Sequence, residues 1–278
     1  MRRSGDAGMT GFAFRELLKD YGARACTFVL VLLAWDQSVR WGLVSANLLP
    51  TPWAVAKALW FGYTGEGALW PHFFETAMET LLGFLLGSAI ALIVGAAIAE
   101  FRTLERFIYP YVVALQSMPK VALAPLLIVW CGFGLLSKVV LVALICFFPM
   151  FVNVVAGLHS SRAELIDLYT AFSASRWQVF LDVKLPSALP SIFAGLQISL
   201  VLALLGAVVG EFVASQKGLG SLIQAASLNF DVPVMFACMV TLAVMGATAS
   251  ALMRALQRHF LFWEADRGND TSTTSSPG

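Results

Sequence analysis

Long apolar stretches separated by short polar segments run through most of the chain. A helix needs about 20 mainly apolar residues to cross the hydrocarbon layer of a membrane. Six stretches reach or approach that length, at about 25–45, 78–99, 107–130, 136–157, 189–212 and 234–256. The first is the weakest, because its clean apolar core runs only from Cys26 to Trp35. The pattern predicts an all-α integral membrane protein with about six transmembrane helices.

The first stretch has a second interpretation, as the apolar part of a signal peptide with Val44-Ser45-Ala46 as a poor cleavage site. The polar segment before it is long for a signal peptide, and charged residues intervene before that site. We therefore expect an uncleaved first helix.

Composition agrees with a membrane protein and removes several other classes. Of the 278 residues, 59% are apolar and only 13% are charged, which is far from the composition of a soluble domain. The net charge of +1 gives no indication of nucleic-acid binding. The four cysteines lie in apolar stretches without metal-ligand or C-x-x-C spacing, so neither a disulfide nor a metal site is predicted.

Basic residues predict the orientation, because cytoplasmic loops are enriched in Lys and Arg. With the N-terminus inside, 13 of the 18 basic residues lie in cytoplasmic segments, and five lie outside: Arg40, Lys57, Lys120, Lys138 and Lys217. Both termini are therefore expected in the cytoplasm. The predicted organisation is a cytoplasmic segment at 1–24, a transmembrane domain at 25–262 with a cytoplasmic loop at 159–187, and a disordered Ser- and Thr-rich tail at 263–278.

Small residues recur at every fourth position in two of the predicted spans. The second span has them at Gly83, Gly87, Ala91, Gly95 and Ala99, and the sixth at Ala243, Ala247, Ala251 and Ala255. Such seams let two helix backbones approach closely in lipid. Packing within one subunit is favoured for each seam over an interface between subunits.

Polar residues inside the apolar stretches are candidates for a solute pathway. Gln116 and Ser117 lie in a proline-rich region of the third span, which can either line a wet cavity or simply end a helix at the surface. Asn153 and Gln197 are also candidates, although hydrogen bonding between helices is the favoured use. Glu211 lies near the predicted outer interface, where it can be hydrated or contribute to the pathway.

The polar loop after the fourth span reads as two short helices outside the bilayer. Apolar residues recur at helical spacing after Arg162, and Ser175 and Gln178 form an S-x-x-Q capping box that begins a second helix. Pro186 and Pro190 are expected to separate this unit from the next span. Amphipathic helices of this kind either lie on the bilayer surface or form a handle for a soluble partner.

The spacing of this loop resembles the coupling signature of ABC importer permeases. That signature reads Glu-Ala-Ala, then Gly four residues after the last Ala, then Ile-x-Leu-Pro ten residues beyond the Gly. Asp167, Leu185 and Pro186 match it, whereas other residues replace its two Ala, its Gly and its Ile, namely Leu168, Tyr169, Ser173 and Val183. The resemblance favours the handle over surface adherence. The resemblance implies that these residues couple the chain to an ATPase: Glu164, Asp167, Tyr169, Ser173, Ser175, Arg176, Trp177, Gln178, Val183, Leu185 and Pro186.

Further motifs extend the resemblance over about 46–262. They are Leu49-Pro50-Thr51-Pro52, the run from Pro119 to Pro125, Trp130-Cys131-Gly132-Phe133-Gly134, and Gly218-Leu219-Gly220. Together they look like the nitrate, sulfonate, taurine and pyrimidine-precursor branch of these permeases. The resemblance implies the type I ABC importer permease fold, a location in the bacterial inner (plasma) membrane, and transport of a small polar solute.

The resemblance also implies partners. These are a second copy of the permease, two ABC ATPase subunits docked on the loop, and an external solute-binding protein. The phosphate-binding pattern G-x-x-x-x-G-K-[ST] is absent from the sequence. ATP hydrolysis is therefore expected in a separate subunit, and no catalytic residue and no cofactor is assigned to this chain.

Two rival classes are weighed against the importer. A self-sufficient secondary carrier or channel would not need the loop, and a carrier usually shows a relay of ionisable residues within the membrane. No such relay is recognised in the sequence. An intramembrane enzyme is disfavoured because His72, His159 and His259 are widely separated and no H-E-x-x-H motif occurs.

Overall fold

The computed structural model describes the chain except for residues 1–21, 24–25, 46, 66 and 262–278. The predicted disordered tail and nearly all of the predicted N-terminal segment lie outside the described residues. The described residues form helices and no strand. The all-α fold class is therefore confirmed.

Four helical segments in the described part are long and apolar enough to cross a membrane. They are α3 (Leu69–Glu100), α6 (Leu135–His159), a helix from Arg176 to Val213, and α11 (Val232–Phe260). A fifth span is possible as a bent pair, in which α4 (Arg102–Gln116) meets η2 (Lys120–Leu123) and α5 (Ala124–Cys131) at 85°. The described residues thus contain four or five of the about six predicted spans.

The first predicted span, the weakest of the six, is not among these helices, and it lies partly outside the described residues. The described residues 26–40 are helical, but this stretch is shorter than the roughly 20 residues that a span needs. It packs on α11, where the rings of Trp35 and Phe236 lie 5.8 Å apart.

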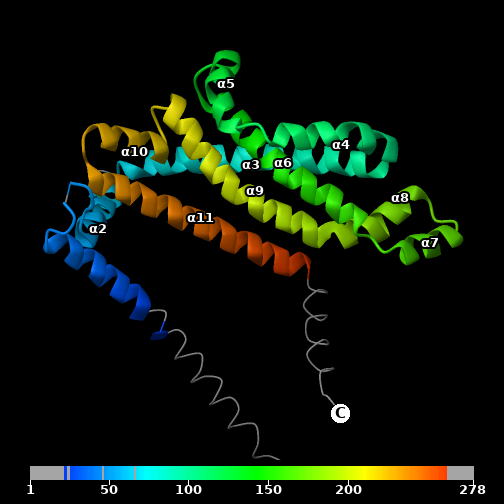
Figure 1. Ribbon diagram of the computed structural model, residues 1–278, viewed down its shortest axis with the longest axis horizontal. Coiled ribbons are helices and arrows are strands. Elements are labelled where there is room, and N and C mark those ends of the chain that lie inside the picture. Colours follow the sequence, from blue (N-terminus) through cyan, green and yellow to red (C-terminus); the bar gives the residue numbers. More distant parts are fainter. Residues whose placement is uncertain (1–21, 24–25, 46, 66, 262–278) are drawn as a thin grey trace, which may run out of the picture.

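The long helices run side by side, with short helices gathered at both ends (Figure 1). The helix α6 lies between α3 and α9 (Leu185–Ala214), and 56% of its most apolar window is buried. At one end of the bundle lie α7 (Ala163–Ala171) and α8 (Arg176–Val179). At the opposite end lie α2 (Pro52–Trp60), which is followed by η1 (Phe61–Gly65), and α10 (Leu219–Leu228). We call these the knob end and the α10 end.

The small-residue seam of α3 packs within the subunit, as predicted. A Cβ placed on Gly87 would lie 2.8 Å from the Cα of Ala143, in the backbone of α6. A Cβ on Gly95 would lie 2.9 Å from a methyl carbon of Val154. Because these distances are shorter than real Cβ contacts, only glycine permits the observed approach of α3 to α6.

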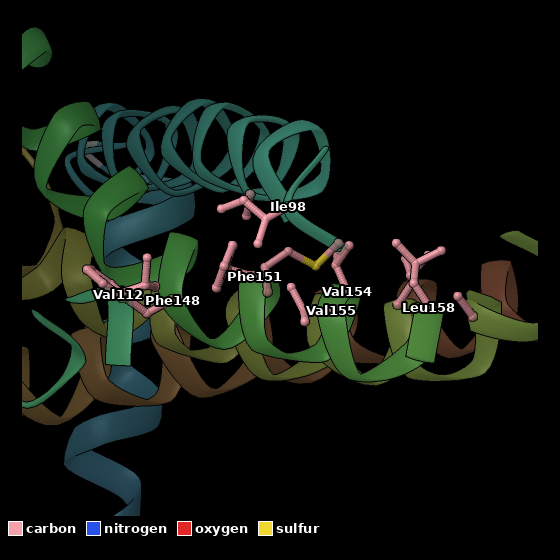
Figure 2. Close-up of a cluster of buried hydrophobic side chains, with 11 residues drawn as sticks. Ile98, Val112, Phe148, Phe151, Val154, Val155 and Leu158 are labelled. Carbon is pink, nitrogen blue, oxygen red and sulfur yellow. The ribbon is translucent and has the colours of Figure 1, made fainter. Parts of the chain in front are cut away.

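Toward the knob end, apolar side chains of α3, α4 and α6 fill the space that this approach leaves (Figure 2). Phe151 and Met150 of α6 are fully buried there, in one cluster with Ile98 of α3. Such packing joins the ends of the spans to the loop that follows α6, and it therefore positions the knob.

The second seam does not pack within the described part of the chain. Ala243, Ala247, Ala251 and Ala255 are all exposed on α11, and only 17% of the most apolar window of that helix is buried. The prediction that this seam packs inside the subunit is therefore wrong for the described residues. The face is available to another helix.

The structure also corrects the expected break between the loop and the next span. The chain from Arg176 to Val213 is one continuous helix, and Pro186 and Pro190 lie within it. A widened turn, η3 (Phe180–Lys184), accommodates the first proline, and the amide of Leu185 at its end donates to the carbonyl of Phe180. A helix can carry a proline where a turn of π-helix relieves the clash with the preceding turn.

Candidate functional site

The coupling knob, which we define as residues 162–186, projects beyond the packed spans at one end of the bundle (Figure 1). Its first helix, α7, has no buried residue. The side chain of Leu168 is 50% exposed and that of Phe172 is 80% exposed. Large apolar side chains that gather on a protruding, otherwise polar element are typical of a protein interaction surface.

Ser173 follows α7 with a backbone φ of +59°. This is the position at which the importer signature has Gly, which adopts positive φ at no steric cost. An L-residue in this conformation is disfavoured by about 1–2 kcal/mol. The turn in the knob thus keeps the backbone shape that a glycine would give, although the sequence has replaced the glycine.

The second helix of the knob is capped as the sequence predicted. The Oγ of Ser175 accepts from the amide of Gln178 at 3.3 Å, and Oε1 of Gln178 accepts from the amide of Ser175 at 2.7 Å. Trp177, exposed on α8, stacks on Phe180 with the ring centroids 5.6 Å apart. The knob is therefore a preformed unit.

An ion pair joins the base of the knob to the end of α3. The Nζ of Lys184 lies 2.7 Å from Oε2 of Glu100, and Val183 beside it is buried. Residues 183–186 of the signature therefore lie in the bundle, whereas residues 164–178 are largely exposed. The base of the knob therefore connects its exposed part to α3.

The candidate pathway residues do not lie together. Gln116 and Ser117 are exposed at the bend between α4 and η2, where Nζ of Lys120 donates to the carbonyl of Gln116 at 2.9 Å. Gln197 of α9 donates to the side-chain oxygen of Gln257 in α11, so it links two helices. Asn153 instead donates to the carbonyl of Pro149 in its own helix, at 2.8 Å, and the expected bond between helices is not made.

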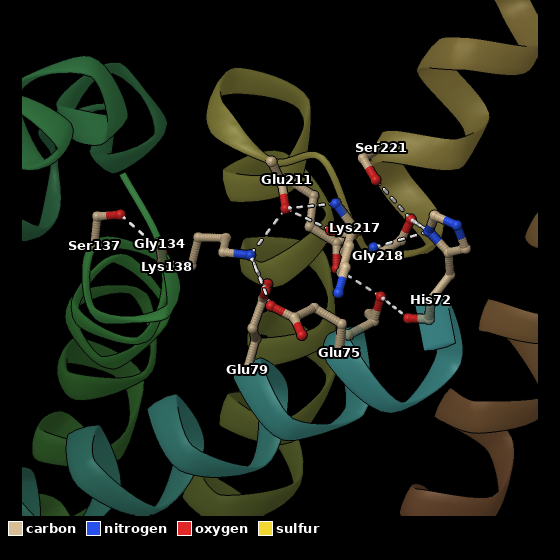
Figure 3. A network of polar contacts seen from close by, with 12 residues as sticks. His72, Glu75, Glu79, Gly134, Ser137, Lys138, Glu211, Lys217, Gly218 and Ser221 are labelled. Atoms are coloured by element: carbon tan, nitrogen blue, oxygen red, sulfur yellow. Dashed lines mark hydrogen bonds and ion pairs between the residues drawn. The ribbon is translucent and has the colours of Figure 1, made fainter. Parts of the chain in front are cut away.

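Glu211 is fully buried, so the alternative that it is hydrated at the interface is wrong. Its carboxylate meets the beginning of α10, as Figure 3 shows. Oε2 accepts from the amide of Gly220 at 2.5 Å, and Oε1 accepts from Oγ1 of Thr76 at 2.5 Å. Thr76 in turn accepts from the amide of Leu219 at 2.8 Å. A residue of α9 and a residue of α3 thus satisfy the first amides of α10.

Lys138 lies beside this contact, in the first turns of α6 (Figure 3). Only 4% of its side chain is exposed, and it forms an ion pair with Glu79 of α3, which is fully buried. Its Nζ also donates to Oγ of Ser215 at 2.9 Å and lies 3.4 Å from Oε1 of Glu75. The sequence interpretation placed Lys138 outside the membrane, and it missed Glu79 and Thr76 altogether.

A signal for these missed residues was present. Glu75 and Glu79 lie one helical turn apart at the beginning of an apolar span, where acids are expensive unless they are paired. Lys138 begins another apolar span. An ion pair between an acid of the first span and Lys138 of the second would explain why both spans begin with charged residues.

Comparison with known proteins identifies the family. Residues 83–262 match the family of inner membrane components of binding-protein-dependent transport systems. The chain belongs to this family. It is therefore a multi-pass membrane protein and a permease component.

Relatives match over most of their length. The chain is 42% identical to the riboflavin transport system permease protein of Chloroflexus aurantiacus, over 86% of this chain and 89% of the relative. It is 30% identical to the formylaminopyrimidine transport permease protein of Halalkalibacterium halodurans, over 85% of this chain and 93% of the relative. It is 29% identical to the taurine transport system permease protein of Escherichia coli K12, over 86% and 89%.

A solved structure shares the fold. The inward-facing MetNI methionine ABC transporter matches with a TM-score of 0.64 and 22% identity, over 70% of this chain and 98% of that chain. The permease fold implied by the resemblance is thus confirmed.

Proposed function

We propose that the coupling knob binds an ABC ATPase subunit in the cytoplasm and passes its movement to a solute pathway between two copies of this chain. The permease itself is the transmembrane subunit of an ATP-driven importer that is supplied by an external binding protein. The observation that carries the proposal is the knob, which exposes Leu168 and Phe172 and in which Asp167, Leu185 and Pro186 lie at the spacing of the importer signature. Its rigid base reaches the spans through Lys184 and Glu100.

The knob also fits a partner adapted to bulkier residues. The signature has two small alanines where this chain has Leu168 and Tyr169. Burial of one exposed leucine side chain in a partner groove contributes about 1.5–3 kcal/mol. We therefore expect the ATPase groove to be wider and more apolar than one that receives alanines.

The exposed seam on α11 supports the proposed pairing of two permeases. Small residues at every fourth position allow close approach of two helices in lipid, and the described part of the chain leaves Ala243, Ala247, Ala251 and Ala255 uncovered. The homodimer, two ATPase subunits, the cytoplasmic location of both termini and the division into domains at 1–24, 25–262 and 263–278 belong to this proposal.

We further propose a small polar solute of the vitamin class. The support is the higher identity to the riboflavin permease, 42%, than to the taurine permease, 29%. A binding protein encoded beside this chain would be tested by calorimetry against riboflavin, formylaminopyrimidine, taurine, an alkanesulfonate and nitrate. Tight binding of only taurine, the sulfonate or nitrate would contradict this assignment.

Co-purification tests the docking. Tagged wild-type chain is expected to bring down the ATPase encoded beside it, and Leu168→Asp is expected to lose it because a carboxylate would have to enter an apolar groove without a partner. Leu228→Asp is the matched control, since Leu228 is also exposed but lies at the α10 end. Equal recovery of the ATPase with Leu168→Asp and with the wild type would overturn the proposal.

A secondary carrier remains the rival, and the buried charges near α10 bear on it. Carriers use chains of ionisable residues that extend along the pathway. Lys138, Glu79 and Glu211 instead lie together at one end of the bundle, and their charges are met by each other and by the amides of α10. Solute uptake by proteoliposomes that contain this chain without any ATPase would favour the carrier.

A further inference from the structure

Helix α10 is held at its beginning by residues of three other helices. With 10 residues it is about 15 Å long, too short to cross the membrane. Glu211 from α9 and Thr76 from α3 accept from its first amides, and Lys138 from α6, which pairs with Glu79 of α3, donates to Ser215 in the loop that leads to it. We call Glu211, Thr76, Lys138 and Glu79, together with the turn at 218–220, the α10 clasp.

The N-cap position of α10 is Gly218, which has no side chain, and Glu211 supplies the missing acceptor from outside that helix. The positive end of a helix dipole and its free amides favour a carboxylate. The turn is shaped around the carboxylate, since a Cβ on Gly220 would lie 2.8 Å from Oε2 of Glu211 and 2.9 Å from the carbonyl of Val208. Gly218 has a φ of +118°, which other residues rarely adopt. Both glycines of the Gly-Leu-Gly motif are thus explained by one buried acid.

The two acids of the clasp are met in different ways, one by a cation and the other by hydrogen-bond donors. Lys138 pairs with Glu79, and Glu211 receives the amide of Gly220 and the hydroxyl of Thr76. Ser215, in the loop that leads to α10, also accepts from Lys138 at 2.9 Å. Because Glu211 and Thr76 accept from the first amides of α10, movement of α10 alone would leave the buried carboxylate of Glu211 without its backbone donor. The ends of α3, α6, α9 and α10 are therefore expected to move together.

The far end of α10 reaches the surface. Leu228 and Phe230 are 78% and 84% exposed, and Phe230 has a φ of +55°. A bulky residue in this conformation is an outlier that suggests a functional constraint. In the orientation proposed above, this turn faces the side from which the external binding protein arrives.

We propose that the α10 clasp passes the docking of the binding protein to the spans, so that Glu211, Thr76, Lys138 and Glu79 are positioning residues for transport. The inference rests on the proposed function, because it needs a binding protein on the α10 end and an ATPase on the knob end. It gives Glu211 a positioning role in place of the pathway role considered from the sequence.

Two threonine variants separate this role from general stability. Thr76→Val keeps the size of the side chain and every charge, but it removes the hydroxyl that connects Leu219 to Glu211. Thr76→Ser keeps that hydroxyl. Amide hydrogen exchange of the segment 215–228 is expected to become about tenfold or more faster in Thr76→Val and in Glu211→Gln, and to stay near the wild-type rate in Thr76→Ser.

The functional readout uses the whole transporter. The permease and the ATPase are reconstituted in nanodiscs. ATP hydrolysis is measured with and without the binding protein, which is added as isolated with its own solute. We expect Thr76→Val and Glu211→Gln to keep basal hydrolysis. The increase in hydrolysis caused by the binding protein is expected to be at least fivefold smaller in these variants than in the wild type. Thr76→Ser and the peripheral control Glu75→Gln are expected to keep the stimulation.

The outcomes separate this inference from the proposed function. Stimulation at the wild-type level in both Thr76→Val and Glu211→Gln would overturn the inference and leave the importer assignment intact. Equal loss in Thr76→Ser and Thr76→Val would also overturn it, because the hydroxyl would then not matter. A wild-type complex whose hydrolysis does not respond to the binding protein would overturn the proposed function, and the inference with it.

Discussion

Replacement of Lys138 by methionine tests whether the buried charges near α10 are paired as described. Lys138 is 4% exposed and Glu79 is fully buried, so Lys138→Met leaves a carboxylate in the bundle without its cation. Removal of one partner of a buried ion pair costs about 3–5 kcal/mol. Removal of both charges avoids that cost, and the double variant Lys138→Met with Glu79→Met is expected within about 1 kcal/mol of the wild type.

The matched control is the pair at the base of the knob. Lys184 and Glu100 lie 2.7 Å apart, but their side chains are 22% and 26% exposed. Lys184→Met is therefore expected to cost less than about 1 kcal/mol, as is usual for ion pairs that water reaches.

Reversible unfolding in mixed micelles of mild detergent and SDS would measure the free energy of unfolding of all these variants. A single variant Lys138→Met that costs no more than Lys184→Met would refute the reasoning. So would a double variant that is less stable than Lys138→Met alone, because the two charges would then not depend on one another.

Two further changes test the knob and the packing of the spans. Ser173→Gly is expected to raise the free energy of unfolding by up to about 1 kcal/mol, since it relieves the positive φ at some cost in chain entropy; a fall in the melting temperature would contradict this. Gly87→Val is expected to cost about 1–3 kcal/mol or more, because its nearest contacts are backbone atoms of Ala143 that cannot move aside. Gly246→Ala is the control, since the nearest atom there is the flexible end of Leu204, and thermal unfolding followed by size-exclusion chromatography distinguishes the two.

The sequence predicted those features that depend on neighbouring residues. The apolar stretch at 136–157 became α6, and the S-x-x-Q pattern at Ser175 became a capping box with both bonds formed. The seam of glycines in α3 predicted close packing because the spacing of four residues places them on one face. Such patterns are local, so a short segment of the sequence is enough to predict the structure that they form.

Features that depend on distant residues could not be predicted. Lys138 pairs with Glu79, far from it in the chain, and nothing in the sequence states which residues of two spans share a level in the bundle. The sequence predicts that Pro186 ends a helix, but in the structure the widened turn η3 precedes Pro186 and the helix continues past it. The sequence places Glu211 near the outer interface, but it does not show that α10 packs over this residue and buries it.

Labelling of the knob tests the central claim most directly. Leu168→Cys, with Cys26 and Cys131 replaced by serine, is treated with a membrane-impermeant thiol reagent in inside-out and right-side-out vesicles. Trp53→Cys on α2 is the control for the opposite side, because Trp53 is 76% exposed at the α10 end.

The account predicts that residue 168 reacts only in inside-out vesicles and that the bound ATPase slows its reaction at least tenfold. Reaction of residue 168 only in right-side-out vesicles, or at the same rate with and without the ATPase, would contradict the account.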